Sequence, residues 1–234
     1  KNEDPGTALH LAASKDDLDL VKDLLEQGAD INARNDKNET PLTAALEGHN
    51  YEIARFLIDR GCGIDLDKVD PVEQGKYYWE ERPVVGLANW AIFKGDVDFA
   101  RTLIGKGLNP KWQGPGGITL LHAAAGCGEL FLCKLLLDGG CSRHSRTRDY
   151  YRPVTMAAAN GHIDIVKIFL HRGDAVESKG DCGKPPLLLA VRNGHYEVVR
   201  YLIDHGANAD ADVDYSGWKL LHSACFRNRP DIVA

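Results

Sequence analysis

The amino-acid sequence predicts an all-α fold, a solenoid of stacked helix-turn-helix units. Six glycines recur along the 234 residues with spacings of 33, 46, 33, 33 and 33. The same apolar pattern precedes every one of them, and the start of another short helix precedes each pattern. Such a repeat indicates stacked units, because one unit cannot bury its apolar stripe without a neighbour. The glycines are Gly28, Gly61, Gly107, Gly140, Gly173 and Gly206.

The apolar pattern predicts the second helix of each unit. Two adjacent apolar residues are followed, after a gap of two, by two more, as in Leu132-Cys133 and Leu136-Leu137. These offsets lie on a single stripe of a helix. The glycine three residues later suits a left-handed helix end, where a side chain is strained. The six patterns begin at Leu20, Ile53, Phe99, Leu132, Ile165 and Val198.

A shorter helix is expected to open each unit. Thr40-Pro41 begins one of them, since threonine is a competent N-cap and proline suits the first turn, where its missing N–H would be unpaired anyway. The third copy, beginning at Gly86, departs furthest from the pattern. The other copies are predicted to start at Thr7, Thr119, Arg152, Pro185 and, in a partial last unit, Lys219.

Three short segments carry a resemblance to a known family. Thr7-Ala8-Leu9-His10-Leu11-Ala12-Ala13 opens a unit, Gly161-His162 joins two helices, and Gly28-Ala29-Asp30 follows a helix. Together they resemble the ankyrin repeat, and the resemblance covers essentially the whole chain. It implies one domain, 1–234, of stacked helix pairs with β-hairpin finger loops. The expected repeats are 2–34, 35–67, 81–113, 114–146, 147–179, 180–213 and a partial 214–234.

The last repeat predicts that the natural protein is longer than this chain. Its second helix stops after a single apolar pair, Ile232-Val233. Terminal repeats need a polar outer face, and neither end of the sequence has one. We therefore expect the natural protein to continue before Lys1 and beyond Ala234.

The second finger loop is longer than the others by 13 residues, which fall within 66–85. Three consecutive aromatic residues lie in this insertion: Tyr77, Tyr78 and Trp79. Exposing them to water is costly, so we expect something to cover them. The cover is either the solenoid itself or a partner, and the sequence leaves both alternatives open.

Other aromatic residues and an arginine run mark a candidate binding face. The resemblance implies that fingers and first helices form a concave surface that binds proteins. Tyrosine and tryptophan are enriched at binding hot spots, and packing between fingers is the alternative role for some of them. The arginines could bind an acidic or phosphorylated segment of the partner. The alternative is that they simply form a solvent-exposed charged surface without a binding role. Besides the insertion aromatics, the candidates are Trp90, Phe93, Trp112, Arg143, Arg146, Arg148, Tyr150, Tyr151, Tyr215 and Trp218.

No catalytic, metal or cofactor site is predicted. His10, His122 and His222 share one position of the repeat. His162 and His195 share another. The resemblance implies that such histidines hydrogen-bond the backbone of the neighbouring finger, which is a structural role. The sequence has no zinc-ligand spacing, P-loop or dinucleotide motif.

The six cysteines fit a reducing compartment, because no C-x-x-C pair occurs among them. Most occupy apolar positions of the repeat and are expected to be small buried side chains. Cys127 and Cys182 are predicted to be the more reactive thiols. The others are Cys62, Cys133, Cys141 and Cys225.

The predicted function is protein–protein interaction, as a scaffold or recognition module of a larger protein in the cytoplasm or nucleus, without catalysis. A formal net charge of −6 argues against general nucleic-acid binding, which needs a basic face. No apolar run reaches the roughly 18 residues of a membrane span. Two alternatives stay open. In the first, the array is a regulatory domain of an enzyme, channel or nucleotide-binding receptor. In the second, it senses a small anion or nucleotide through the insertion and the 143–148 finger.

Overall fold

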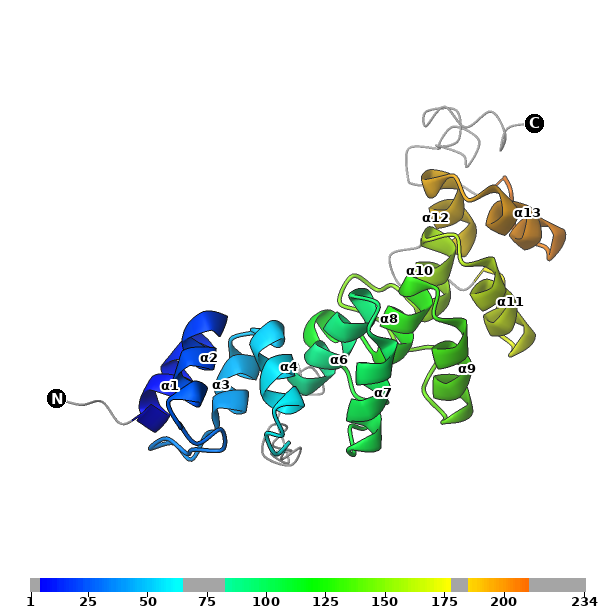
Figure 1. The fold of residues 1–234 in the computed structure, drawn as a ribbon. Helices are drawn as coiled ribbons and strands as arrows, with labels where there is room; N and C mark the ends of the chain where they lie inside the picture. The colour runs from blue at the N-terminus through cyan, green and yellow to red at the C-terminus, as the bar shows by residue number, and fades with distance from the viewer. Residues whose placement is uncertain (1–4, 65–82, 178–184, 211–234) are drawn as a thin grey trace. The chain divides into compact units, whose positions relative to one another are not determined.

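The computed structural model describes residues 5–64, 83–177 and 185–210, and these form helix pairs joined by loops (Figure 1). The chain divides into two compact units, residues 1–115 and 116–234. Among the described residues no β-strand occurs, so the all-α prediction is confirmed. The fingers 35–39 and 147–151 are therefore tight turns, where β-hairpins were expected. Each is closed by one backbone hydrogen bond between its ends, from Asn35 to Glu39 and from Thr147 to Tyr151.

The described residues of the first unit form three helix pairs, and we call the first helix of each pair inner and the second outer. Its inner helices are α1 (Pro5–Ser14), α3 (Pro41–Glu47) and α6 (Pro83–Phe93), and its outer helices are α2 (Leu18–Glu26), α4 (Tyr51–Asp59) and α7 (Val97–Gly105). Each inner helix packs against its own outer helix, and α3 packs against both α1 and α6. The inner helices thus form a row, as the repeat register predicts.

The second unit repeats this arrangement. Its inner helices are α8 (Leu120–Cys127), α10 (Pro153–Ala159) and α12 (Pro186–Asn193), and its outer helices are α9 (Leu130–Asp138), α11 (Ile163–His171) and α13 (Tyr196–Asp204). Helix α10 packs against α8 and α12, and α11 packs against α9 and α13. A short 3-10 turn, η1 (Pro115–Gly117), lies at the boundary of the two units.

The helix starts agree with the sequence in most repeats and differ in two. Thr40 and Thr119 accept hydrogen bonds at the N-termini of α3 and α8, as expected. The predicted start at Thr7 was wrong, because α1 already begins at Pro5. The predicted start at Gly86 was also wrong, because α6 begins at Pro83. The end of the insertion therefore adds a first turn to α6, which is stabilised by complete burial of two valines, Val84 and Val85.

The six register glycines end the outer helices in the left-handed conformation that the sequence predicts. Their φ angles lie between +76° at Gly140 and +107° at Gly107. A side chain with a Cβ is strained in this region. The register of glycines therefore sets where each outer helix stops.

Gly140→Val is expected to lower the free energy of unfolding by about 1–2 kcal/mol, because a β-branched residue is strained at a φ of +76°. Urea denaturation at neutral pH measures this change. Gly105→Ala in the last turn of α7 is the control. No atom lies within 4 Å of a Cβ placed there, so this variant is expected to lose no stability. An unchanged midpoint for Gly140→Val would contradict the register.

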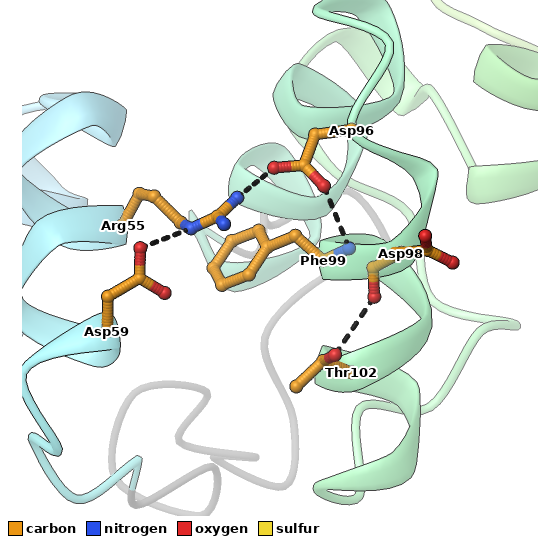
Figure 2. Close-up of polar contacts among 6 residues, drawn as sticks. All are labelled: Arg55, Asp59, Asp96, Asp98, Phe99 and Thr102. Carbon is orange, nitrogen blue, oxygen red and sulfur yellow. Dashed lines mark hydrogen bonds and ion pairs between the residues drawn. The ribbon is translucent and has the colours of Figure 1, made fainter.

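A cluster centred on Arg55 joins the second and third repeats of the first unit (Figure 2). The Arg55 guanidinium donates to Asp59 at 2.8 Å and to Asp96, and it lies 3.9 Å from the centroid of the Phe99 ring. Asp96 also caps α7 by accepting from the Phe99 amide at 3.1 Å. The hydrogen bond from Arg55 is the main cause of the lowered pKa of Asp96. The cluster therefore links α4 to α7, although residues 65–82 separate them in sequence.

The repeated histidines have two different structural roles. His10 donates to the Glu39 carbonyl at 2.8 Å, and His122 donates to the Tyr151 carbonyl at 3.0 Å. These two bonds to finger backbone are the expected ones. His162 and His195 instead donate to carbonyl groups at the ends of the preceding inner helices, Gly126 at 3.0 Å and Ala159 at 2.8 Å. The prediction of a finger contact was wrong for this second pair.

Candidate functional site

In the first unit, two candidate aromatic residues lie one helical turn apart on α6. Phe93 is 51% exposed, and Trp90 is half-buried. The Trp90 ring faces Tyr51, with ring centroids 6.2 Å apart. Tyr51 also packs directly over Gly86 and leaves no room there for a Cβ. Tyr51 therefore fixes the inner side of the Trp90 ring, while the Phe93 ring extends into solvent.

His49 adds a strained position next to this aromatic pair. Its φ is +58°, whereas the equivalent residue in four other repeats is a glycine with φ between +77° and +83°. The exposed imidazole lies against Tyr51, with ring centroids 5.9 Å apart, and its Nδ1 is 3.0 Å from the Tyr51 hydroxyl. We call His49, Tyr51, Trp90 and Phe93 the aromatic cluster.

In the second unit, the arginine run begins with an internal ion pair. Arg143 donates through Nε to Asp174 Oδ1 at 2.9 Å, and His144 Nδ1 lies 3.5 Å from the same oxygen. The Asp174 side chain is only 1% exposed. Asp174 occupies a repeat position that holds Ala29, Cys62, Leu108, Cys141 and Ala207 elsewhere. Burial raises the pKa of Asp174 in spite of the nearby cations.

Asp174→Ala is expected to leave the free energy of unfolding unchanged or to raise it by up to about 1 kcal/mol at pH 7.5. A raised pKa means that folding disfavours the carboxylate, and alanine fits this position in other repeats. Chemical denaturation measures the difference. Asp164→Ala, at an exposed position in the first turn of α11, is the control and should lose a few tenths of a kcal/mol. A loss above about 1 kcal/mol for Asp174→Ala would mean that the ion pair stabilises the fold.

The tip of this finger carries an exposed tyrosine in a strained conformation. Tyr150 has a φ of +61° and is 45% exposed. Asn38 and Gly117 hold the same position in other fingers, with φ of +63° and +74°, and both residue types tolerate this region better than tyrosine. A backbone bond of 2.8 Å from Arg148 to Gly116 fixes the finger against its neighbour in the unit.

The structure separates the predicted binding residues into two groups and leaves several outside its range. Trp90, Phe93 and the half-buried Trp112 belong to the first unit. The arginine finger belongs to the second unit, with Arg146 half-buried, Arg148 exposed, and Tyr151 half-buried beside its carbonyl bond to His122. Tyr77, Tyr78, Trp79, Tyr215 and Trp218 lie outside the described residues.

Sequence reasoning missed three residues of these surroundings. His49 replaces the glycine that precedes most outer helices by two positions, Tyr51 opens α4, and Asp174 replaces a small apolar residue. All three departures can be seen when the repeats are aligned on their glycines.

Three thiols of the described residues are weaker acids than a free cysteine. Burial raises the pKa of Cys62 to about 11 and that of Cys133 to about 12. The pKa of Cys127 is also raised, by burial and by Glu129, which opposes the predicted reactivity because the thiolate is the reactive form. Cys182 lies outside the described residues.

Within the described ranges, no three His, Cys, Asp or Glu side chains gather as metal ligands would. None of the helices in that part of the chain is long and apolar enough to cross a membrane.

Paired helices, left-handed glycine ends and tight finger turns define a helical repeat protein. A family model described as ankyrin repeats (3 copies) matches residues 1–70, 88–179 and 154–234. The chain therefore belongs to the ankyrin repeat family, whose arrays are protein–protein interaction modules.

Several relatives share parts of the array. Ankyrin repeat protein L371 of Acanthamoeba polyphaga mimivirus is 26% identical over 122 residues, which cover 52% of this chain and 14% of the relative. NF-kappa-B inhibitor cactus of Drosophila yakuba is 45% identical over 68 residues, which cover 29% of this chain and 14% of the relative. Protein phosphatase 1 regulatory subunit 12A of Mus musculus is 35% identical over 81 residues, which cover 35% of this chain and 8% of the relative. The chain thus spans only a small part of the length of these relatives.

Proposed function

We propose that this chain is a protein-recognition module that binds its partner through the finger tips and inner helices. The observation that carries the proposal is Tyr150, a large aromatic side chain that is held exposed at a strained finger tip. Two relatives, an NF-kappa-B inhibitor and a phosphatase regulatory subunit, are regulators by name. This is consistent with a regulatory interaction here.

The strain at Tyr150 supports a binding role because folding alone favours another residue. A left-handed conformation costs a non-glycine residue on the order of 1–2 kcal/mol. An exposed aromatic ring at the same place recovers little of that cost by packing. Strained, exposed side chains of this kind occur at functional sites, where a partner makes use of their fixed position.

The aromatic cluster supports a second contact region, in the first unit. His49 is strained in the same way, and Phe93, one helical turn from Trp90 on α6, is exposed. Tyr51 holds the inner side of the cluster, so binding would need little reordering of side chains. Fixed aromatic anchors of this type often contribute about 2 kcal/mol or more each to binding.

The anion-sensing alternative is less well supported than protein binding. Asp174 already neutralises Arg143, so the 143–148 finger offers a bound anion one cation fewer than the sequence indicated. Recognition is also the simpler proposal, since ankyrin arrays are protein–protein interaction modules.

An affinity capture from the source cells tests the proposal. Wild-type chain, Phe93→Ala, Tyr150→Ala and the double variant are immobilised at equal amounts. The captured protein should decrease in each single variant and disappear in the double variant. Tyr196→Ala on α13 is the control, because Tyr196 is 41% exposed but lies on an outer helix. If the double variant still captures the protein, the proposed binding face is wrong. If calorimetry shows heat of binding with nucleotides, the result favours the anion-sensing alternative.

A further inference from the structure

Two aromatic residues of the inner helix α6 have no counterpart in the other complete repeats. Trp90 and Phe93 are three residues apart and therefore lie on one face of the helix. Phe93 is 51% exposed, and Trp90 is half-buried, with its ring 6.2 Å from that of Tyr51. The five other complete repeats have no aromatic residue at either position. They have Leu11, Ala44, Ala123, Met156 and Leu189 at the first position, and Ser14, Glu47, Gly126, Ala159 and Arg192 at the second.

A carboxylate without an ion-pair partner lies on the neighbouring inner helix. Glu47, the last residue of α3, corresponds to Phe93 in the repeat register, and α3 packs against α6. Glu47 is exposed, and its side chain forms no ion pair or hydrogen bond within the described part of the chain. Partial burial and the nearby carboxylate of Glu39 raise the pKa of Glu47, and Lys37 offsets part of this rise. The negative charge of Glu47 is thus available to a cation from outside.

The Arg55 cluster shows what an aromatic ring and a carboxylate bind together in this protein. Between the outer helices of the same two repeats, the Arg55 guanidinium donates to Asp59 and Asp96 (Figure 2). It also lies 3.9 Å from the centroid of the Phe99 ring. The ring attracts and stacks on the planar cation, and the carboxylates accept its N–H groups.

The inner helices of these two repeats offer the same two components without the cation. No lysine or arginine of the described part of the chain lies over either aromatic ring of α6. Helices that pack together lie about 8–10 Å apart, so a guanidinium between α3 and α6 can contact a ring and the carboxylate at once.

We propose that Glu47, Trp90 and Phe93 bind an arginine side chain of the partner protein, and we call these three residues the arginine site. This assignment rests on the proposed function, because it specifies what the aromatic cluster contacts in the partner. An arginine suits the site better than a lysine, since the ammonium group has no planar surface to stack on a ring.

Charge complementarity favours a basic segment of a partner as the occupant. Residues 1–115 contain 14 basic and 21 acidic residues, a net charge of −7. Such a field attracts cationic segments. The segment 65–82 of the same unit contains six acidic and three basic residues, so its charge does not favour it as the occupant.

The test is an NMR titration of the isotope-labelled whole chain with Nα-acetyl-arginine amide. The readout is the indole N–H signal of Trp90, which is identified by its absence in Trp90→Phe. The arginine probe should shift this signal saturably, with a dissociation constant on the order of 1–10 mM. Nα-acetyl-citrulline amide has nearly the same shape without the charge and should cause no saturable shift. Nα-acetyl-lysine amide should bind at least about threefold more weakly than the arginine probe.

Two variants and a charge-matched control assign the effect to the site. Glu47→Gln should weaken binding of the arginine probe at least about fivefold, and Phe93→Ala about threefold. Glu26→Gln on the outer helix α2 removes the same charge from another exposed position and should bind like wild type. Glu47 and Phe93 are both exposed, so unchanged melting temperatures will separate loss of the site from loss of the fold.

The arginine site is overturned if the arginine probe causes no saturable shift, if the citrulline or lysine probe binds as tightly, or if Glu47→Gln binds like wild type. Self-association of the chain that Glu47→Gln abolishes would also overturn it, since the arginine would then come from a second copy. The proposed function fails by a different result. Capture of the partner that does not depend on Phe93 or Tyr150 contradicts the proposed binding face even when the arginine probe binds.

Discussion

Phe169→Ala is expected to lower the free energy of unfolding by about 3–5 kcal/mol. Phe169 is completely buried in α11, which packs against α9, α10 and α13. Removing the ring leaves a cavity that four packed helices cannot close, so the lost transfer energy and the cavity both contribute. Urea denaturation followed by circular dichroism at pH 7.5 measures the change.

The repeat itself supplies the matched control for Phe169. Every other outer helix carries leucine at this position, so Phe169→Leu substitutes the residue that the repeat otherwise uses. It is expected to cost roughly 1 kcal/mol, because a smaller volume is lost and leucine suits the site. Equal losses for the alanine and leucine variants would mean that cavity volume does not determine the effect. The leucines are Leu24, Leu57, Leu103, Leu136 and Leu202.

Acidification from pH 7.5 to pH 5 is expected to remove on the order of 2 kcal/mol of stability through His122 alone. His122 is fully buried in the first turn of α8. Its Nε2 donates to the Tyr151 carbonyl at 3.0 Å, and its Nδ1 accepts from the Thr119 amide at 3.2 Å. Burial lowers the pKa of His122 from 6.5 to about 4. The ring therefore stays neutral in the folded chain.

The sign of this effect follows from the two pKa values. The unfolded histidine takes up a proton below about pH 6.5, whereas the folded one resists protonation down to about pH 4. The stabilisation is complete above pH 6.5 and is lost as the pH falls between these values. His122→Asn carries the residue of the third repeat, Asn89, and cannot titrate there. This variant should have a lower free energy of unfolding than wild type at pH 7.5. Between pH 7.5 and pH 5 its free energy of unfolding should fall by about 2 kcal/mol less than that of wild type. A parallel loss in both proteins would contradict this account.

The helices could be predicted from the sequence because each obeys a local rule that repeats. The glycine register placed the ends of all six outer helices, and proline or threonine marked most inner starts. The extra turn of α6 was missed because the insertion occurs once, so no second copy could reveal where it becomes helical. Pro83 was a local start signal, but the register argument led to Gly86 instead.

The candidate site was less accessible to sequence reasoning, because its features depend on conformation and burial. Tyr150 was identified as an aromatic finger residue, but its positive φ becomes clear only beside Asn38 and Gly117. Arg143 was grouped with a run of like charges, whereas its actual partner, Asp174, is 31 residues away in the next finger. Pairing of this kind follows from stacking geometry, which a single repeat does not reveal.

The division into two compact units has a consequence for how unfolding is observed. Trp79, Trp90 and Trp112 belong to the first unit, and only Trp218 belongs to the second. Intrinsic tryptophan emission thus reports mainly on residues 1–115, while the helical signal in circular dichroism comes from both units. Two optical probes can therefore follow different parts of one chain. Where their transitions coincide, the units melt cooperatively, and where they separate, a single midpoint describes neither unit.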